Sequence, residues 1–276
     1  MKLISPVLFL LFWLGCLTTL AQTSQPYGSN HGKYITIFHT KIYYEEYGKG
    51  PPLLMLHGGA GSIQDFQKVL PELSKHYHII APDSPGHGRS EQADSLGYQL
   101  MANYFSKFID DLKLDNVYII GWSDGGNTAL ILAADRPNKI KRIMVSGANA
   151  TTEGLRDKGN GSSGFTPEYV EKESKEWLAW YQKLSPQKDQ WKKFVNDSRK
   201  MWLTPIAVPE TKLKMIKCPT LVVMGDKDII TLEHGQYIHN TLRGSELFVV
   251  TGSGHNTFNL KPELMTKLAL DFFGEK

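Results

Sequence analysis

A short stretch around Ser123 constrains the fold of this chain more than any other feature. The apolar, β-branched run Val117-Tyr-Ile-Ile ends at Gly121, and an alanine- and leucine-rich helical pattern begins just after Gly125. Ser123 is therefore expected on a tight turn between a strand and a helix. Glycines on both sides of the serine allow the strained backbone of such a turn. The pattern predicts a nucleophile elbow, with Oγ clear of the sheet and a helix N-terminus that favours negative charge beside it.

The pattern G-x-S-x-G also fits an ordinary glycine-rich turn, so the partners of the serine decide its meaning. A serine hydroxyl needs a base within hydrogen-bond reach, and that base needs a group that fixes its tautomer. His255 is the predicted base because it ends the glycine-containing loop Thr251-Gly-Ser-Gly-His, after the last expected strand. His57 is the strongest competitor among the other eight histidines. It precedes the serine, however, which breaks the order Ser, Asp, His.

Two aspartates are candidates for the acid that orients the histidine. Asp226 and Asp228 both follow the β-branched strand expected at Leu221–Met224, and they are two residues apart. We favour Asp228, at the loop position, with Asp226 as a turn-forming residue. The predicted catalytic residues are therefore Ser123, Asp228 and His255.

A second glycine-rich loop is expected to supply part of an oxyanion hole. A strand that begins at Pro52 leads into His57-Gly-Gly-Ala-Gly-Ser62, where the backbone can approach a ligand closely. We expect the N–H groups of Gly59 and Asp124 to hold the oxyanion. A phosphate-binding loop is the alternative, but neither Gly-Lys-Ser/Thr nor a G-x-G-x-x-G helix start follows.

Asp124 is also the candidate substrate-binding residue. A carboxylate beside an oxyanion hole opposes the negative charge that develops there, unless a cation compensates it. The α-ammonium group of a substrate would supply that cation. The alternatives are that an arginine or lysine of the protein pairs with Asp124, or that it turns away as a helix N-terminal cap.

Strands alternate with helices along most of the chain, which predicts an α/β fold with a mostly parallel sheet covered by helices on both faces. Residues 31–150 and 206–276 are assigned to this core. Residues 151–205 show no strand pattern and are rich in tryptophan, so they are predicted to form a helical lid over Ser123. The other expected elements are a hairpin of strands at 33–38 and 42–47, strands at 77–81, 140–146 and 246–250, and helices at 66–76, 98–112, 232–242 and 262–273.

The N-terminus is read as a secretory signal peptide. Lys2 precedes an apolar run from Leu3 to Leu20, and a small residue, Ala21, ends the predicted peptide of residues 1–21. The mature protein is then expected to be periplasmic or secreted, without a stable membrane partner. An uncleaved anchor and lipidation at Cys16 are the alternatives considered.

Charge and cysteine content exclude several classes of function. Lysines and arginines are scattered among acids, and the formal net charge is only +3, so nucleic-acid binding is not indicated. Of the two cysteines only Cys218 would survive processing, which rules out an intramolecular disulfide in the mature chain. Cys218 is expected to be a small buried residue. No metal and no cofactor is predicted, and the expected partner is a small-molecule ester substrate.

Together these motifs resemble the α/β-hydrolase superfamily over about residues 33–273. A closer likeness within it rests on four motifs: Gly121-Trp-Ser-Asp-Gly-Gly126, Ser146-Gly-Ala-Asn-Ala150, Lys217-Cys-Pro-Thr-Leu and Gly254-His-Asn256. Through these motifs the chain resembles the valacyclovir hydrolase group, also called biphenyl hydrolase-like proteins. The aspartate after the nucleophile recognises the ammonium group of α-amino acid esters in that group, which implies the same role for Asp124. The expected export signal and the lid depart from the resemblance, so the leaving group and the side-chain preference stay open.

The predicted function is a metal-free serine hydrolase that cleaves small carboxylic esters, including α-amino acid esters if the resemblance holds, through an acyl-enzyme. A C–C bond hydrolase, a lactonase and a peptidase of the same fold are alternatives. A dehalogenase with an aspartate nucleophile is disfavoured because the elbow holds Ser123. From a different class, a non-catalytic ligand-binding protein could also keep this fold.

Overall fold

The computed structural model describes residues 26–28, 30–157 and 164–274 of the 276-residue chain. The predicted signal peptide and Cys16 lie outside the described residues. Across the described ranges, no helix combines the length and the apolar character needed to cross a bilayer.

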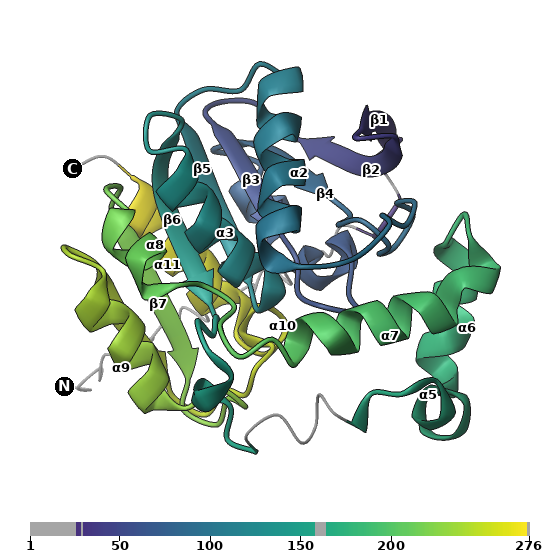
Figure 1. Cartoon of the computed structure of the whole chain (residues 1–276). Coiled ribbons are helices and arrows are strands. Elements are labelled where there is room, and N and C mark those ends of the chain that lie inside the picture. Colours follow the sequence, from purple (N-terminus) through teal and green to yellow (C-terminus); the bar gives the residue numbers. More distant parts are fainter. Residues whose placement is uncertain (1–25, 29, 158–163, 275–276) are drawn as a thin grey trace, which may run out of the picture.

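A sheet of eight strands organises the described chain (Figure 1). The strand order is β1-β2-β4-β3-β5-β6-β7-β8. β2 pairs antiparallel with β1 and β4, and every other neighbouring pair is parallel. The loops that follow the parallel strands therefore gather at one edge of the sheet, where ligands bind in folds of this class. The strands are β1 (Lys33–Ile37), β2 (Thr40–Tyr47), β3 (Pro52–Leu56), β4 (His78–Pro82), β5 (Val117–Trp122), β6 (Ile140–Ser146), β7 (Thr220–Gly225) and β8 (Glu246–Val250).

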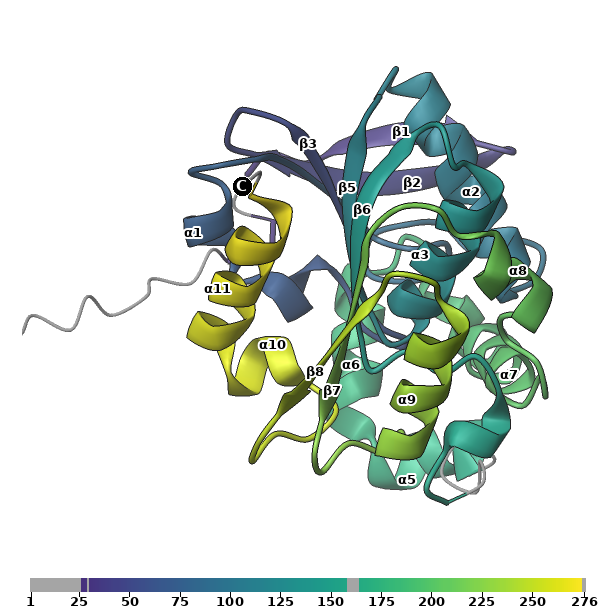
Figure 2. The same cartoon turned by 90° about the vertical axis from the view of Figure 1, so that its left-hand side faces the viewer.

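Helices cover both faces of the sheet, as predicted (Figure 2). On one face lie α2 (Tyr98–Asp111), α3 (Asp124–Asp135), α8 (Glu210–Met215) and α9 (Leu232–Thr241), and on the other lie α1 (Leu70–Leu73), α10 (Thr257–Leu260) and α11 (Pro262–Phe273). Every residue of the central strands β5 and β7 is buried between these layers. This burial explains their continuous apolar sequences, in place of the alternation of a half-exposed strand.

The expected helix at 66–76 is wrong in extent. In its place lie a 3-10 turn, η1 (Ile63–Phe66), and the four-residue helix α1. Pro71 occupies the start of α1, where its missing N–H is tolerated, but a proline inside a longer helix would lose a hydrogen bond and clash with the preceding turn. The short helices α8 and α10 were not expected from the sequence.

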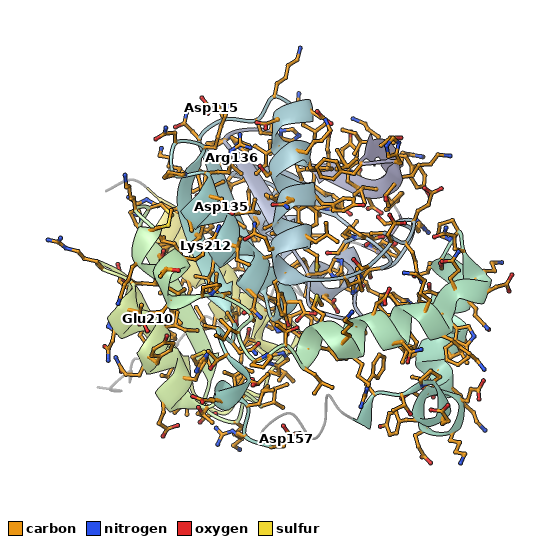
Figure 3. All side chains as sticks on the ribbon, viewed as in Figure 1. Asp115, Asp135, Arg136, Asp157, Glu210 and Lys212 are labelled. Carbon is orange, nitrogen blue, oxygen red and sulfur yellow. The ribbon has the colours of Figure 1, made fainter. Side chains whose placement is uncertain are left out.

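The outer helices are joined by ion pairs on the surface. Lys212 of α8 pairs with Asp135 at the end of α3 (Figure 3). Arg136, the next residue, pairs with Asp110 of α2 at 2.5 Å. Pairs this exposed contribute little to stability individually. They link α8 and α2 to α3, the helix that begins at the predicted elbow.

The segment predicted as a lid holds α5 (Pro167–Glu173), α6 (Lys175–Leu184), α7 (Trp191–Trp202) and the turns η2 (Thr152–Gly154) and η3 (Lys188–Gln190). Its two ends meet where Thr151 and Ile206 form an isolated antiparallel bridge. A small apolar core of its own contains Val170, Tyr181 and Phe194. The boundaries at 151 and 205 stay a prediction.

The lid segment rests on loops that follow β3 and β4. The indole of Trp177 donates to the carbonyl oxygen of Ala60 at 2.9 Å. The ring of Phe194 meets that of His87 edge to face at 4.7 Å. Both loops lie at the edge of the sheet where the parallel strands end, so the lid segment borders the region predicted to hold the active site.

Candidate active site

Ser123 has the strained backbone that a nucleophile elbow requires. It lies between β5 and α3 with φ 54° and ψ −118°, which a residue with a side chain rarely adopts. A Cβ atom on Gly125 would lie 2.0 Å from the carbonyl oxygen of Leu56, and one on Gly121 would lie 2.4 Å from the carbonyl oxygen of Gly125. The flanking glycines therefore let the turn pack tightly against β3.

The three predicted catalytic side chains form one hydrogen-bonded chain. Nε2 of His255 lies 2.8 Å from Oγ of Ser123, and Nδ1 of His255 lies 2.6 Å from Oδ1 of Asp228. Asp228 is fully buried, whereas about a fifth of the His255 side chain is exposed. An ionised carboxylate accepts the Nδ1 proton, which leaves Nε2 free to accept the proton of the serine hydroxyl.

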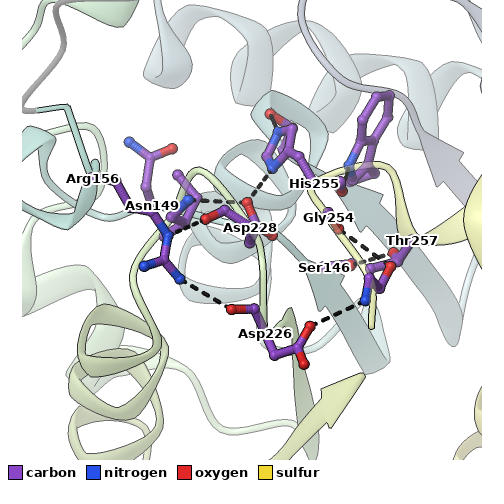
Figure 4. A network of polar contacts seen from close by, with 12 residues as sticks. Ser146, Asn149, Arg156, Asp226, Asp228, Gly254, His255 and Thr257 are labelled. Carbon is purple, nitrogen blue, oxygen red and sulfur yellow. Dashed lines mark hydrogen bonds and ion pairs between the residues drawn. The ribbon is translucent and has the colours of Figure 1, made fainter. Parts of the chain in front are cut away.

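The two candidate acids have different neighbours (Figure 4). Asp228 contacts His255, and its Oδ1 also accepts the backbone N–H of Ile230 at 3.0 Å. Asp226 instead accepts the N–H of Ser253 at 3.1 Å and so ties its turn to the loop that carries the histidine. The guanidinium of Arg156 donates to the backbone carbonyl oxygens of both aspartates. Asp228 is therefore the aspartate in contact with His255, as the predicted triad requires, and Asp226 lies in the neighbouring turn.

His57, the competing histidine, has a different environment. It is 1% exposed, and its Nε2 accepts the backbone N–H of Ser84 at 2.9 Å. Burial, with a smaller contribution from neighbouring His87, lowers the pKa of His57 to about 3. Its two ring nitrogens make hydrogen bonds to the loops after β3 and β4 and not to Ser123.

Gly59 and Asp124, the predicted oxyanion donors, both line the pocket that contains Ser123. Asp124 is the first residue of α3, so its N–H has no acceptor within the helix. A Cβ atom on Gly59 would lie 2.3 Å from Oδ2 of Asp124. The glycine-rich loop thus passes directly against the helix that follows the serine, as two converging donors require.

The carboxylate of Asp124 is only 4% exposed and is held by two neutral donors. The hydroxyl of Tyr98 donates to Oδ1 at 2.9 Å, and the indole of Trp202 donates to Oδ2 at 2.7 Å. Burial raises the pKa of Asp124, against the lowering effect of these two hydrogen bonds and of His255. Across residues 26–28, 30–157 and 164–274, no ion pair joins Asp124 to a lysine or arginine. The side chain does not cap α3 either.

A pocket of about 640 Å³ opens over Ser123 between the core and the lid segment. Its apolar wall includes Phe165, Tyr169, Trp202 and Ile230, and Asp157 lies at its outer part, near the edge of the molecule (Figure 3). Among the described residues that line this pocket, two are aspartates, Asp124 and Asp157, and none is a lysine or arginine. An anionic ligand would therefore find no lysine or arginine partner in the described part of this wall.

Sequence reasoning missed Tyr98 and Asn149 as pocket residues. Tyr98 begins a helix 25 residues before the serine, and its sequence position gives no sign of the bond to Asp124. Asn149 was noted only as part of a family motif. Its side-chain oxygen accepts a hydrogen bond from the side-chain amide of Asn127 in α3, and its backbone N–H donates to Oδ1 of Asn127, which fixes it at the pocket wall. Trp202, from the tryptophan-rich segment predicted as a lid, also lines the pocket.

Cys218 precedes β7 whereas Asp228 follows it, and the side chain of Cys218 is half-buried, not fully buried as expected. It packs against the core beside β7, and burial raises the pKa of its thiol to about 11. A thiol held protonated is a poor nucleophile. Across the described ranges, no group of three or more histidine, cysteine, aspartate or glutamate side chains could hold a metal ion.

Comparison with known proteins points to one family. Residues 51–179 match a family model described as the alpha/beta hydrolase fold. The human serine hydrolase BPHL is 30% identical over 260 residues, which covers 86% of this chain and 84% of the human protein. The 2-hydroxy-6-oxo-2,4-heptadienoate hydrolase of Pseudomonas putida is 24% identical over 75% of this chain and 83% of its own length.

Among solved structures, the enol-lactonase of Burkholderia xenovorans superposes with a TM-score of 0.71 at 20% identity. The superposition covers 88% of this chain and all of the lactonase chain. The fold, the elbow and these relatives together show that the chain belongs to the α/β-hydrolase fold family.

Proposed function

We propose that this hydrolase is a serine esterase that cleaves α-amino acid esters through an acyl-enzyme. Oγ of Ser123 would attack the ester carbonyl carbon while its proton moves to Nε2 of His255. The imidazolium, held by Asp228, would then protonate the departing alcohol. A water molecule would next lose a proton to His255, attack the acyl-enzyme and release the acid and Ser123.

The tetrahedral oxyanion would be held by the N–H groups of Gly59 and Asp124. Loss of one such donor typically lowers the rate about 100- to 1,000-fold. The position of Asp124 at the first turn of α3, beside the loop of Gly59, supports this assignment.

One observation carries the preference for amino esters: a buried carboxylate lies beside the nucleophile and has only neutral partners among the described residues. A buried charge without a counter-ion is costly unless a ligand supplies one. A substrate α-ammonium group would pair with Asp124, offset its opposition to the oxyanion and place the ester carbonyl next to Ser123. The 30% identity with the human serine hydrolase BPHL supports a hydrolysis that uses a serine nucleophile.

The same electrostatics argue against a C–C bond hydrolase of carboxylate substrates, the activity named for the Pseudomonas relative. A dienoate substrate is an anion, and it would enter a pocket whose described wall carries carboxylates and no lysine or arginine.

The test compares L-leucine benzyl ester with its desamino analogue, 4-methylpentanoic acid benzyl ester, so that only the ammonium group differs. Ser123→Ala should abolish both hydrolyses and also labelling by a fluorophosphonate. Asp124→Asn should lower kcat/KM for the leucine ester about 10- to 100-fold, the size of a lost charge-assisted hydrogen bond, and change the desamino ester by less than about threefold.

Asp157→Asn is the matched control, because it removes a carboxylate from the outer part of the same pocket. If Asp124→Asn lowers both substrates equally, Asp124 is structural and the amino ester assignment is wrong. A wild-type enzyme that prefers the desamino ester would refute it as well.

A further inference from the structure

A buried network of polar side chains lies beneath the glycine-rich loop and takes no part in the proposed chemistry. Asp83, which follows β4, is fully buried. Its Oδ1 accepts the N–H of Ile63 at 3.0 Å, and its Oδ2 accepts the N–H of Arg89 at 2.8 Å and the hydroxyl of Tyr27. A buried carboxylate with this many donors fixes the backbone segments that supply them.

The last of these donors comes from the N-terminal segment Tyr27–Gly28. The ring of Tyr27 lies over the guanidinium of Arg89 at 4.6 Å, and the ring of Tyr43 lies 5.2 Å from the same group. Gly28 donates its N–H to the buried carboxylate of Glu45 at 2.8 Å. Two residues of the N-terminal segment are therefore anchored to two buried carboxylates and one arginine.

Asp83 and its neighbour Ser84 hold both ends of the loop that carries Gly59. Ile63, bound to Asp83, comes directly after the loop. His57, which accepts the N–H of Ser84 at 2.9 Å, comes directly before it. The path of the loop between these two residues depends on where Asp83 lies.

We propose that Tyr27 is a positioning residue for the oxyanion hole: it fixes the Asp83 carboxylate, and Asp83 in turn fixes the loop that presents the N–H of Gly59. This inference rests on the proposed function for its effect on rate. Its effect on the loop itself is independent of which substrate the enzyme takes. Tyr27 follows the predicted signal cleavage site by six residues, so a chain cleaved after Ala21 keeps it.

Two variants separate the hydroxyl from the segment. Tyr27→Phe keeps the ring over Arg89 and removes only the donor to Asp83. Gly28→Ala acts on the backbone, because Gly28 has φ +79° and a Cβ atom there would lie 2.4 Å from a guanidinium nitrogen of Arg89. The controls are Tyr237→Phe, which removes a hydroxyl that donates to the exposed Glu210, and Gly97→Ala, where nothing lies within 4 Å of the new Cβ.

The experiment measures hydrogen exchange of the full chain by mass spectrometry, together with kcat and KM on p-nitrophenyl acetate. Both Tyr27→Phe and Gly28→Ala should speed exchange in peptides that cover residues 57–66, while peptides from β5 and β6 keep their protection. We expect kcat to fall about tenfold with KM nearly constant, a smaller loss than removal of an oxyanion donor. The two controls should match the wild type in both measurements.

Unchanged exchange at 57–66 in both variants would overturn the proposal whatever the activity shows. A uniform rise in exchange across β5 and β6 would also overturn it, because Tyr27 would then only stabilise the fold. A wild-type enzyme with no esterase activity would contradict the proposed function, and the exchange data would still decide whether Tyr27 positions the loop.

Discussion

The indole of Trp202 donates a 2.7 Å hydrogen bond to the carboxylate of Asp124, and this contact joins the last residue of the lid helix α7 to the residue that follows the nucleophile. The segment predicted as a lid therefore holds a polar group of the site in place and also forms part of the pocket wall. A shift of α7 would move the carboxylate that we propose reads the substrate ammonium.

Trp202→Phe should weaken selection of the amino ester. The variant removes a donor that lowers the pKa of Asp124, so the carboxylate form becomes less stable. We expect kcat/KM for L-leucine benzyl ester to fall about tenfold, and that of the desamino ester to change much less. Trp180→Phe is the control, because its indole contacts Gln64 and it does not line the pocket. Equal losses for both esters would show that Trp202 only shapes the pocket.

A second prediction concerns acid stability. Burial lowers the pKa of His87 to about 4, against 6.5 in the unfolded chain. Between pH 4 and pH 6.5 the unfolded state therefore binds more protons than the folded state. The contribution of His87 to the free energy of unfolding is complete above pH 6.5 and is lost as the pH falls toward 4. The slope is at most about 1.4 kcal/mol per pH unit.

His87→Phe should therefore lose less unfolding free energy than the wild type between pH 7 and pH 5, as measured by urea denaturation. Phenylalanine can keep the edge-to-face contact with Phe194. The exposed His76, changed to Gln, serves as the control and should follow the wild type. If His87→Phe lost as much unfolding free energy as the wild type between pH 7 and pH 5, groups other than His87 would account for the acid sensitivity.

Those features of the site that depend on local patterns could be predicted from sequence. The strand, glycines and helix around Ser123 are encoded within about twenty residues, and parallel strands bring Asp228 and His255 to the same edge. The choice of Asp228 over Asp226 followed from its loop position, and the hydrogen bond to His255 agrees with it.

Contacts between distant segments could not be predicted in the same way. Tyr98 and Trp202 reach Asp124 from 26 and 78 residues away, and which helix face meets the pocket is settled by tertiary packing. Tyr27 belongs to no periodic pattern, so nothing in the sequence connects it with Asp83. The expected helix at 66–76 is wrong for a different reason, which is local. Pro71 lies in the first turn of the separate short helix α1, where a longer helix could not continue through it.

Phe194 should be a main source of lid stability. It is 1% exposed, stacks on Trp177 at 5.7 Å and packs against Tyr181 at 5.4 Å. Phe194→Ala should lower the unfolding free energy by about 3–5 kcal/mol, as for other large cavities. Met215→Ala, at an exposed position, should change it by less than about 0.5 kcal/mol. If Phe194→Ala lowered the unfolding free energy measured in urea by as little as Met215→Ala, the lid would unfold separately from the core.

The two aspartates after β7 give the sharpest test of the proposed triad. In Asp228→Asn the side-chain amide can donate to Nδ1 of His255, which moves the ring proton to Nε2 and leaves no acceptor for the hydroxyl of Ser123. We expect kcat to fall about 10⁴-fold with little change in KM. Asp226→Asn keeps an oxygen that can accept the N–H of Ser253, so its kcat should stay within about tenfold of the wild type. Circular dichroism of both variants checks that they fold. The reverse ranking of the two variants would make Asp226 the orienting acid and disprove the triad proposed here.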